Sequence, residues 1–156
     1  MQQINIPYYQ SLTLQHLILD YNGTIAKDGV LKETVKTLLT KLCARYTVHV
    51  ITADTFGSVK AQMADFDVIV TVLQTDNHTA EKATYIDGLD KTLCVAIGNG
   101  NNDSNMLDNA SLGIAVIGDE GCATVTLLKS DITCTSIEDA LALLLNEKRL
   151  IATLRK

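Results

Sequence analysis

The chain has 156 residues, of which 47% are hydrophobic and 20% are charged, and its formal net charge at pH 7 is −5. A chain of this length and apolar content can bury a core, which excludes the disordered and collagen-like classes and leaves room for only one domain of ordinary size. No basic tract occurs, so we expect no nucleic-acid partner bound through phosphate neutralisation. We therefore expect a single domain over residues 1–156.

The sequence offers no signal for a membrane or for secretion. Its longest apolar stretches, such as Leu141–Leu145, are far shorter than the roughly 20 residues that span a bilayer. Met1–Gln15 lacks the charged start and the apolar middle of a signal peptide. The four cysteines form no CxxC pair and the three histidines are not at ligand spacing, so a zinc site is not expected. We expect a cytoplasmic protein without a membrane partner.

Apolar runs alternate with helical patterns along most of the chain. After short apolar segments at Ile4–Ile6 and Leu12–Leu14, the sequence predicts strands at 17–19, 47–51, 68–72, 93–97, 113–117 and 132–134. The predicted helices cover 31–44, 79–89, 105–110, 123–128 and 137–145. The strands are continuously apolar, which indicates a sheet covered on both faces. Repeated strand–helix–strand units imply right-handed crossovers, so we predict an α/β fold of three layers with a Rossmann-like parallel sheet.

Polar residues at the carboxyl ends of these strands are the candidates for function, because ligands of such folds bind there. The first predicted strand ends at Asp20, in the segment Asp20-Tyr21-Asn22-Gly23-Thr24. A carboxylate in this position can attack phosphorus or bind a cation. An isolated DxxG pattern is more often a simple turn. The residues at the other strand ends are therefore needed to distinguish a catalytic carboxylate from a simple turn.

Three further segments supply groups that suit a phosphate and a cation. The second strand ends in Thr52-Ala53-Asp54-Thr55, whose hydroxyl and backbone amides suit a phosphate oxygen. Lys82 lies in a predicted helix, where its ammonium either neutralises a transferring phosphoryl group or faces solvent. The segment GNGNND after the fourth strand offers Asn99 and Asp103 as oxygen ligands for a hard cation.

In chain order, DYNGT, ITADT, Lys82 and GNGNND resemble the four motifs of the haloacid-dehalogenase (HAD) superfamily of phosphohydrolases. The resemblance spans about Leu17 to Gly118, most of the chain. Within the superfamily, the motifs look most like those of small soluble proteins similar to the phosphorylation domain of P-type ATPases, which carry DKTGT and GDGxND. The resemblance implies a HAD-like core domain, Mg²⁺ as cofactor and a phosphorylated substrate.

The resemblance also implies a role for each motif residue. Asp20 would be the nucleophile that forms an aspartyl-phosphate intermediate, with Asn22, Thr52 and Lys82 as the other catalytic residues. The phosphoryl oxygens would be bound by Thr52, Ala53 and Lys82. Mg²⁺ would be held by the Asp20 side chain, the Asn22 backbone carbonyl and the fourth motif, through either Asn99 or Asp103.

Two positions depart from the pattern of the phosphatases in this superfamily. Asn22 stands where most of them have a second aspartate that acts as general acid and base. General acid–base catalysis contributes about 10²–10⁴-fold, so we expect weak hydrolysis of alkyl phosphates and a longer-lived phosphoenzyme. Asn99 stands where relatives often have aspartate, which lowers the negative charge offered to the cation.

The spacing of the motifs bears on the substrate. One helix and part of a strand take up most of the interval from Asp20 to Thr52, and again from Thr52 to Lys82, so no cap domain fits. An open site admits a small molecule or a macromolecule, or is closed by a second copy of the chain. The sequence also leaves two other classes open: a regulatory module that binds phosphate or metal with little turnover, and a receiver-like domain. The lack of an acidic pair after the first strand argues against the receiver-like domain.

Overall fold

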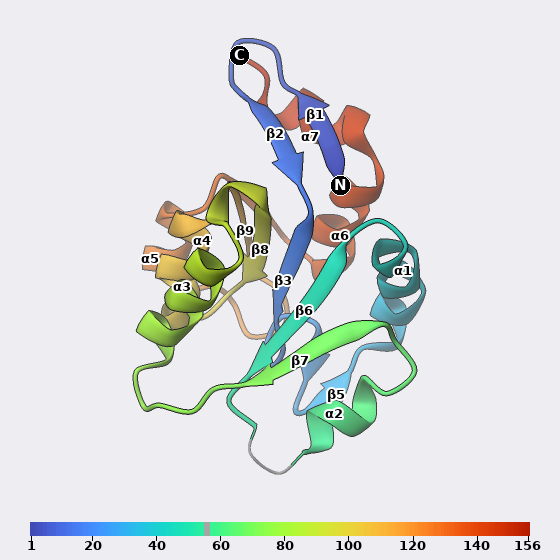
Figure 1. Cartoon of the computed structure of the whole chain (residues 1–156), viewed down its shortest axis with the longest axis vertical. Helices are drawn as coiled ribbons and strands as arrows, with labels where there is room; N and C mark the ends of the chain where they lie inside the picture. The colour runs from blue at the N-terminus through green and yellow to red at the C-terminus, as the bar shows by residue number, and fades with distance from the viewer. Residues whose placement is uncertain (55–56) are drawn as a thin grey trace.

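The computed structural model describes residues 1–54 and 57–156, and its centre is a parallel sheet of six strands (Figure 1). The strands are β3 (His16–Asp20), β6 (Thr47–Thr52), β7 (Val68–Val72), β8 (Cys94–Gly98), β9 (Leu112–Val116) and β10 (Ile132–Cys134). They lie in the order β10-β9-β8-β3-β6-β7, and each neighbouring pair is parallel. The predicted α/β fold with a parallel sheet is confirmed.

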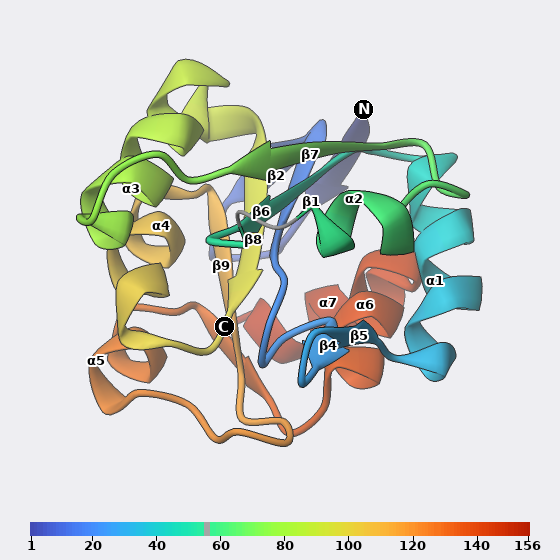
Figure 2. The same cartoon turned by 90° about the horizontal axis from the view of Figure 1, so that it is seen from below.

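Helices cover both faces of this sheet and complete the three layers. They are α1 (Glu33–Cys43), α2 (Ser58–Gln62), α3 (His78–Gly88), α4 (Ser104–Asn109), α5 (Thr124–Leu128), α6 (Ile137–Leu145) and α7 (Glu147–Leu154), with single 3-10 turns η1 (Lys91–Leu93) and η2 (Asn101–Asp103). Figure 2 shows α3, α4 and α5 on one face, and α1, α6 and α7 on the other. Among the described residues, no helix combines the length and the apolar character needed to cross a bilayer.

The apolar pattern of the sequence explains why the middle of the sheet is dry. Leu17, Ile18 and Leu19 of the central strand β3 are each 0% exposed, because helices pack on both of its faces. On one of these faces α1 presents Val35, Leu39 and Leu42, which are spaced as one stripe of a helix and are fully buried. Burying one such side chain stabilises the fold by roughly 1.5–3 kcal/mol, so the two faces hold the strand ends in place.

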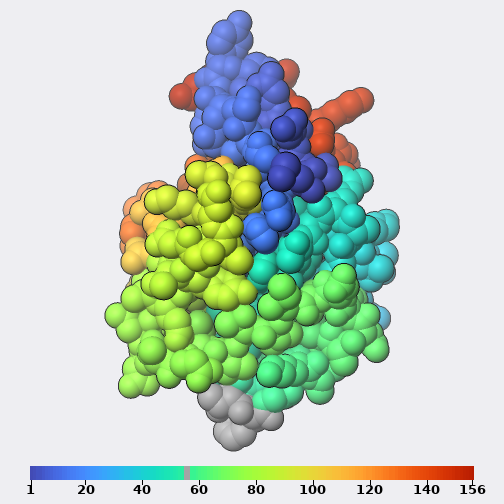
Figure 3. Space-filling model, in the orientation of Figure 1, coloured from blue at the N-terminus to red at the C-terminus, as the bar shows by residue number. Residues whose placement is uncertain are grey.

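Two hairpins outside the main sheet were not predicted. β1 (Gln2–Asn5) and β2 (Ser11–Leu14) pair antiparallel and project from one end of the molecule (Figure 3). β4 (Ala26–Lys27) and β5 (Val30–Leu31) form a second, shorter hairpin. The predicted helix start at residue 31 is therefore wrong: Leu31 pairs with Ala26, and α1 begins two residues later. Between β3 and β6 the described chain holds only this hairpin and α1, with no cap domain.

Candidate active site

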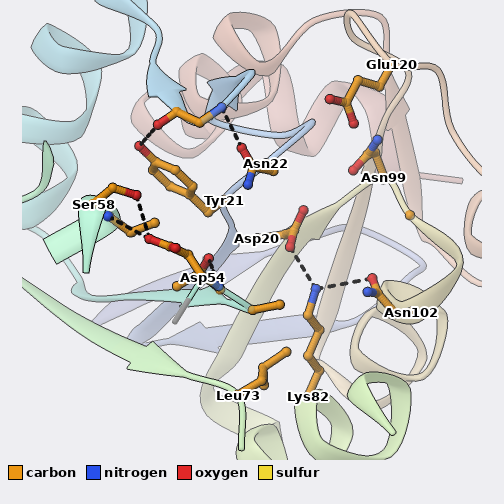
Figure 4. Close-up of a pocket in the computed structure, with 15 residues that line it drawn as sticks. Asp20, Tyr21, Asn22, Asp54, Ser58, Leu73, Lys82, Asn99, Asn102 and Glu120 are labelled. Carbon is orange, nitrogen blue, oxygen red and sulfur yellow. Dashed lines mark hydrogen bonds and ion pairs between the residues drawn. The ribbon is translucent and has the colours of Figure 1, made fainter. Parts of the chain in front are cut away.

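The carboxyl ends of β3, β6 and β8 meet at a cavity of about 530 Å³ (Figure 4). Its wall includes residues from every segment that the sequence singled out: Asp20, Asn22, Thr52, Ala53, Lys82 and Asn99. Asp103 lies directly behind this wall with 0% exposure. Thr55 of the ITADT segment lies outside the described residues. Parallel strands end at the same edge of a sheet, which is why segments so distant in sequence converge here.

Asp20 is the last residue of β3 and is 8% exposed, and a tight turn follows it. The Tyr21 carbonyl accepts hydrogen bonds from the amides of Ile25 and Ala26, each at 3.0 Å. This turn needs the left-handed backbone of Gly23, whose φ is +80°. It returns the Thr24 hydroxyl to Asp20, where it donates to Oδ2 at 3.0 Å. The DYNGT segment is thus a structure that fixes one carboxylate oxygen.

Lys82 of α3 fixes the other oxygen of Asp20. Its Nζ lies 2.7 Å from Asp20 Oδ1 and 2.7 Å from Asp103 Oδ1, and the lysine is only 2% exposed. Burial and then the charge of Asp103 raise the pKa of Asp20 to about 7, against the opposing effects of Lys82 and Thr24. Burial lowers the pKa of Lys82, but the two carboxylates outweigh it and the pKa of Lys82 is raised overall. The Lys82 ammonium thus pairs with the carboxylates of Asp20 and Asp103 where solvent is largely excluded.

Asp103 uses both of its oxygens within the protein. While Oδ1 accepts from Lys82, Oδ2 accepts from the backbone amides of Asn99 at 3.0 Å and Gly100 at 2.9 Å. A methyl group on Gly98 would lie 2.5 Å from the Asp103 carboxyl carbon, so only glycine leaves room for this arrangement. Asp103 therefore orients Lys82 and the loop after β8, and it does not line the open cavity.

The end of β6 offers donors on the opposite side of Asp20. Thr52 is the last residue of this strand and is 3% exposed. Its hydroxyl accepts a hydrogen bond from the Asp54 amide at 3.0 Å, which folds the chain around Ala53. Asp54 in turn accepts hydrogen bonds at the start of α2, from the Ser58 hydroxyl at 2.6 Å and the Val59 amide at 3.2 Å. This turn places the Thr52 hydroxyl and the Ala53 backbone on the cavity wall.

Asn22 does not point its side chain at Asp20. Its Oδ1 accepts the Gly29 amide at 3.0 Å, and the hydroxyl of Tyr21 donates to the Gly29 carbonyl at 3.0 Å. Both polar groups of Gly29 are therefore held by the two residues that follow Asp20 (Figure 4). These contacts fasten the turn of the β4–β5 hairpin to the rim of the cavity.

Asn99 brings an amide oxygen beside Asp20. Its Oδ1 lies 3.3 Å from the Thr24 hydroxyl, which also contacts Asp20 Oδ2. The Thr24 hydroxyl therefore lies between the Asn99 oxygen and the Asp20 oxygen. A carboxylate and an amide oxygen are hard donors of the kind that Mg²⁺ prefers. Within residues 1–54 and 57–156, no three His, Cys, Asp or Glu side chains are arranged to hold a metal. A cation here would therefore have to use amide and carbonyl oxygens as well as carboxylates.

Sequence reasoning missed several residues that line the cavity, among them Asn102 and Glu120. Asn102 Oδ1 accepts a hydrogen bond from Lys82 at 3.2 Å, and its place in GNGNND could have indicated this. Glu120 comes from the loop after β9, and no pattern in the sequence marks it. Away from the cavity, His16 Nδ1 and His49 Nε2 lie 3.1 Å apart, a contact that the histidine spacing did not predict.

Comparison with known proteins gives two partial sequence relatives. No family model matches the chain. A protein of Methanocaldococcus jannaschii described as uncharacterized is 64% identical over 61 residues, which are 39% of this chain and 66% of that protein. A second uncharacterized protein of the same organism is 51% identical over 39 residues, which are 25% of this chain and 89% of that protein. The chain thus spans just under two thirds of the first relative.

Solved structures resemble the chain over nearly all of its length. The 3-deoxy-D-manno-octulosonate 8-phosphate phosphatase of Moraxella catarrhalis, in complex with magnesium, phosphate and KDO, gives a TM-score of 0.69 at 17% identity over 91% of this chain and 94% of that one. The cobalt-bound phosphatase of the same name from Haemophilus influenzae gives 0.71 at 12% identity over 92% and 94%. A HAD-superfamily subfamily III A hydrolase from Legionella pneumophila gives 0.69 at 18% identity over 90% and 87%. These structural similarities show that the chain has the fold of the haloacid-dehalogenase superfamily.

Proposed function

We propose that this chain is a Mg²⁺-dependent phosphohydrolase in which Asp20 forms an aspartyl-phosphate intermediate. The observation that carries the proposal is the Asp20–Lys82 pair, with its N–O distance of 2.7 Å, at the wall of a cavity next to the end of β6. The phosphatase structures of the same fold support the reaction class, and two of them were solved with magnesium or cobalt. The motifs favour a phosphoenzyme like that of P-type ATPases.

Each of these cavity residues has a separate role in the proposed reaction. An Asp20 oxygen attacks phosphorus, the ester O–P bond breaks, and the leaving oxygen takes a proton from solvent. Thr52 and the Ala53 amide bind phosphoryl oxygens from one side, while Lys82 offsets their charge from the other. Water then attacks phosphorus, which releases inorganic phosphate and regenerates the Asp20 carboxylate. Asp103 holds Lys82 in position throughout.

The oxygens beside Asp20 fit a hard cation. Asp20 Oδ2, Asn99 Oδ1 and the Asn22 backbone carbonyl form the donor set that we assign to Mg²⁺. Asp103 is left out because it is 0% exposed and does not line the cavity. Two carboxylates against one lysine give the cluster a net negative charge, which also favours a cation. When bound, Mg²⁺ would neutralise charge on the phosphoryl group.

A second function, a phosphate- or metal-binding module with little turnover, is favoured by one observation. The residue that could act as general acid is an asparagine, and its side-chain oxygen is engaged by the Gly29 amide. A carboxamide does not exchange protons near neutral pH, so poor leaving groups would depart slowly. This module would use the same cavity and the same cation, and the two functions differ only in rate.

The test is hydrolysis of p-nitrophenyl phosphate with Mg²⁺, because this leaving group needs little protonation. Asp20→Asn should reduce turnover to less than a few per cent of the wild type while leaving the circular dichroism spectrum unchanged. Asp76→Asn serves as the matched control, since Asp76 is exposed and does not line the cavity. We expect it to keep wild-type turnover.

The outcomes separate the two functions. Mg²⁺-dependent release of p-nitrophenol that disappears with Asp20→Asn supports the phosphohydrolase. Tight phosphate binding without turnover in the wild type would favour the binding module instead. Turnover that survives Asp20→Asn contradicts the assignment of the nucleophile, and turnover that survives an excess of chelator contradicts the need for a cation.

A further inference from the structure

Glu120 lines the cavity beside Asn99 and lies on a loop that contacts other segments. Figure 4 shows it on the same side of the cavity as Asn99, across from Asp54 and Ser58. A methyl group built on Gly23 would lie 2.9 Å from Asn99 Nδ2 and 3.0 Å from Oδ1, and would overlap the Glu120 carboxylate. The carboxylate and the Asn99 amide therefore approach the same point beside the turn that follows Asp20.

The residues on both sides of Glu120 are fixed. On one side, Asp119 Oδ2 lies 3.2 Å from Lys32 Nζ, an ion pair to the segment before α1. On the other, the Gly121 carbonyl accepts Asn99 Nδ2 at 3.0 Å, and two residues further the Ala123 amide donates to the Asn99 carbonyl at 2.8 Å. Asn99 thus holds the loop with its amide nitrogen while its oxygen faces Asp20.

The Glu120 carboxylate has no bonding partner among the described residues. Across the described part of the chain it accepts no hydrogen bond and forms no ion pair, although it lines the cavity. Its neighbours in the proposed donor set supply little charge, because Asn99 and the Asn22 carbonyl are neutral and only Asp20 is a carboxylate. A divalent ion held by one carboxylate keeps a net positive charge, and Mg²⁺ sites in proteins use one or two carboxylates.

We infer that Glu120 is the second carboxylate of the cation site. It supplies the negative charge that an aspartate at position 99 would have supplied. An aspartate at position 99 would add a negative charge but could not donate a hydrogen bond to the Gly121 carbonyl. The asparagine lacks this charge, but its hydrogen bond to Gly121 holds the loop that carries Glu120. This inference rests on the proposed function, because it concerns the same cation. It makes Glu120 a binding residue that determines cation affinity, and leaves the attack on phosphorus to Asp20.

The test measures the cation directly, without substrate. Mn²⁺ replaces Mg²⁺, and the electron paramagnetic resonance signal of the free ion gives its dissociation constant for the purified chain. Glu120→Gln should raise this constant about 30-fold, the size expected for one carboxylate about 4 Å from a divalent ion at an effective dielectric constant close to that of water. Glu120→Asp keeps the charge and should show a smaller loss. Glu33→Gln is the matched control, because Glu33 is exposed and pairs only with Lys36 among the described residues.

Activity provides the second readout. Raising Mg²⁺ should restore the rate of Glu120→Gln toward the wild type, because affinity is lost and the nucleophile is not. An unchanged Mn²⁺ constant in Glu120→Gln, alongside a weakened one in Asp20→Asn, overturns the inference and leaves the proposed function standing. Absence of Mn²⁺ binding by the wild type overturns both. A loss of rate in Glu120→Gln that excess Mg²⁺ does not restore also contradicts the inference.

Discussion

Asn22 shows how a single residue changes the chemistry available to this cavity. It lies two residues after Asp20, and its side-chain oxygen accepts the Gly29 amide at 3.0 Å. Together with the Tyr21 hydroxyl, which donates to the Gly29 carbonyl at 3.0 Å, it fastens the β4–β5 turn. The position that would carry a general acid therefore serves to hold the rim of the cavity.

We predict that Asn22→Asp raises the hydrolysis of alkyl phosphates by roughly 10-fold or more, a threshold set below the contribution of about 10²–10⁴-fold that general acid–base catalysis typically makes. One carboxylate oxygen can keep the hydrogen bond to Gly29 while the other transfers a proton to the leaving group. The gain should be smaller for p-nitrophenyl phosphate, whose leaving group departs without a proton. The measurement is kcat and KM for both substrates, since the added charge beside Asp20 can weaken phosphate binding.

Two results bear on this interpretation of Asn22. Equal rates for wild type and Asn22→Asp on both substrates would show that proton transfer is not the missing element. Asn22→Ala is the comparison that removes the hydrogen bond without adding an acid, so it isolates the effect of releasing the turn.

The residues of the cavity differ in how far the sequence could predict them. Asp20, Thr52 and Asn99 come at or directly after the ends of apolar strands, and the structure brings them together because parallel strands end at one edge. Glu120 could not be found this way. Its loop is placed by the Asn99–Gly121 hydrogen bond and the Lys32–Asp119 ion pair, and contacts between distant residues leave no local pattern.

At the scale of elements, the apolar pattern predicts the six strands of the sheet but neither of the two hairpins. Buried strands appear as continuous apolar runs, whereas a hairpin depends on its turn. The turn at Asp28 and Gly29, with φ of 50° and 81°, follows an Asp-Gly signal that is present in the sequence. The turn of β1–β2 carries Tyr8 at φ 59°, a conformation that no local signal predicts for a bulky residue.

A chain of polar side chains links β3, β6, β7 and α3 away from the cavity. His16 Nδ1 lies 3.1 Å from His49 Nε2, and His49 Nδ1 lies 2.8 Å from the Tyr85 hydroxyl, which accepts from Thr71 at 3.3 Å. His49 is 2% exposed. Burial, and then the neighbouring His16, lower the pKa of His49 to about 4. The folded chain therefore keeps His49 neutral where an unfolded chain would protonate it.

This histidine predicts a loss of stability in mild acid. A histidine in the unfolded chain has a pKa near 6.5, so between that pH and about 4 the unfolded state binds the extra proton and stability falls as pH falls. Above pH 6.5 the contribution is constant. At pH 4.5 we expect the free energy of unfolding to have dropped by about 2 kcal/mol through His49 alone. Urea unfolding at pH 7.5, 5.5 and 4.5 measures the drop.

His49→Gln is the matched variant, because glutamine can hydrogen-bond to Tyr85 but does not titrate. It should flatten the pH dependence, while the carboxylates that also titrate in this range act equally on both proteins. The same slope in wild type and His49→Gln would contradict the assignment of the acid sensitivity to His49.

At the scale of the whole molecule, the β1–β2 hairpin lies at the end opposite the cavity (Figures 1 and 3). It is nevertheless part of the main core. Ile4, Ile6, Leu12 and Leu14 are each at most 3% exposed and belong to the same cluster of contacts as Leu17 and the other buried residues of β3. We therefore propose that residues 1–156 unfold as one unit, although the hairpin does not pair with the main sheet.

Leu14→Ala tests this unity. Truncating a fully buried leucine typically costs about 2–5 kcal/mol, and in a single cooperative unit the loss reaches every part of the fold. We expect amide hydrogen exchange of Val50 and Ile97, in strands beside the cavity, to speed up by the same free energy as that of β2. Tyr8→Ala is the control: Tyr8 is 88% exposed at the tip of the hairpin, and the change should stay within about 0.5 kcal/mol. If Leu14→Ala accelerated exchange only in residues 1–14, the hairpin would be a separate unit and the cavity would not depend on it.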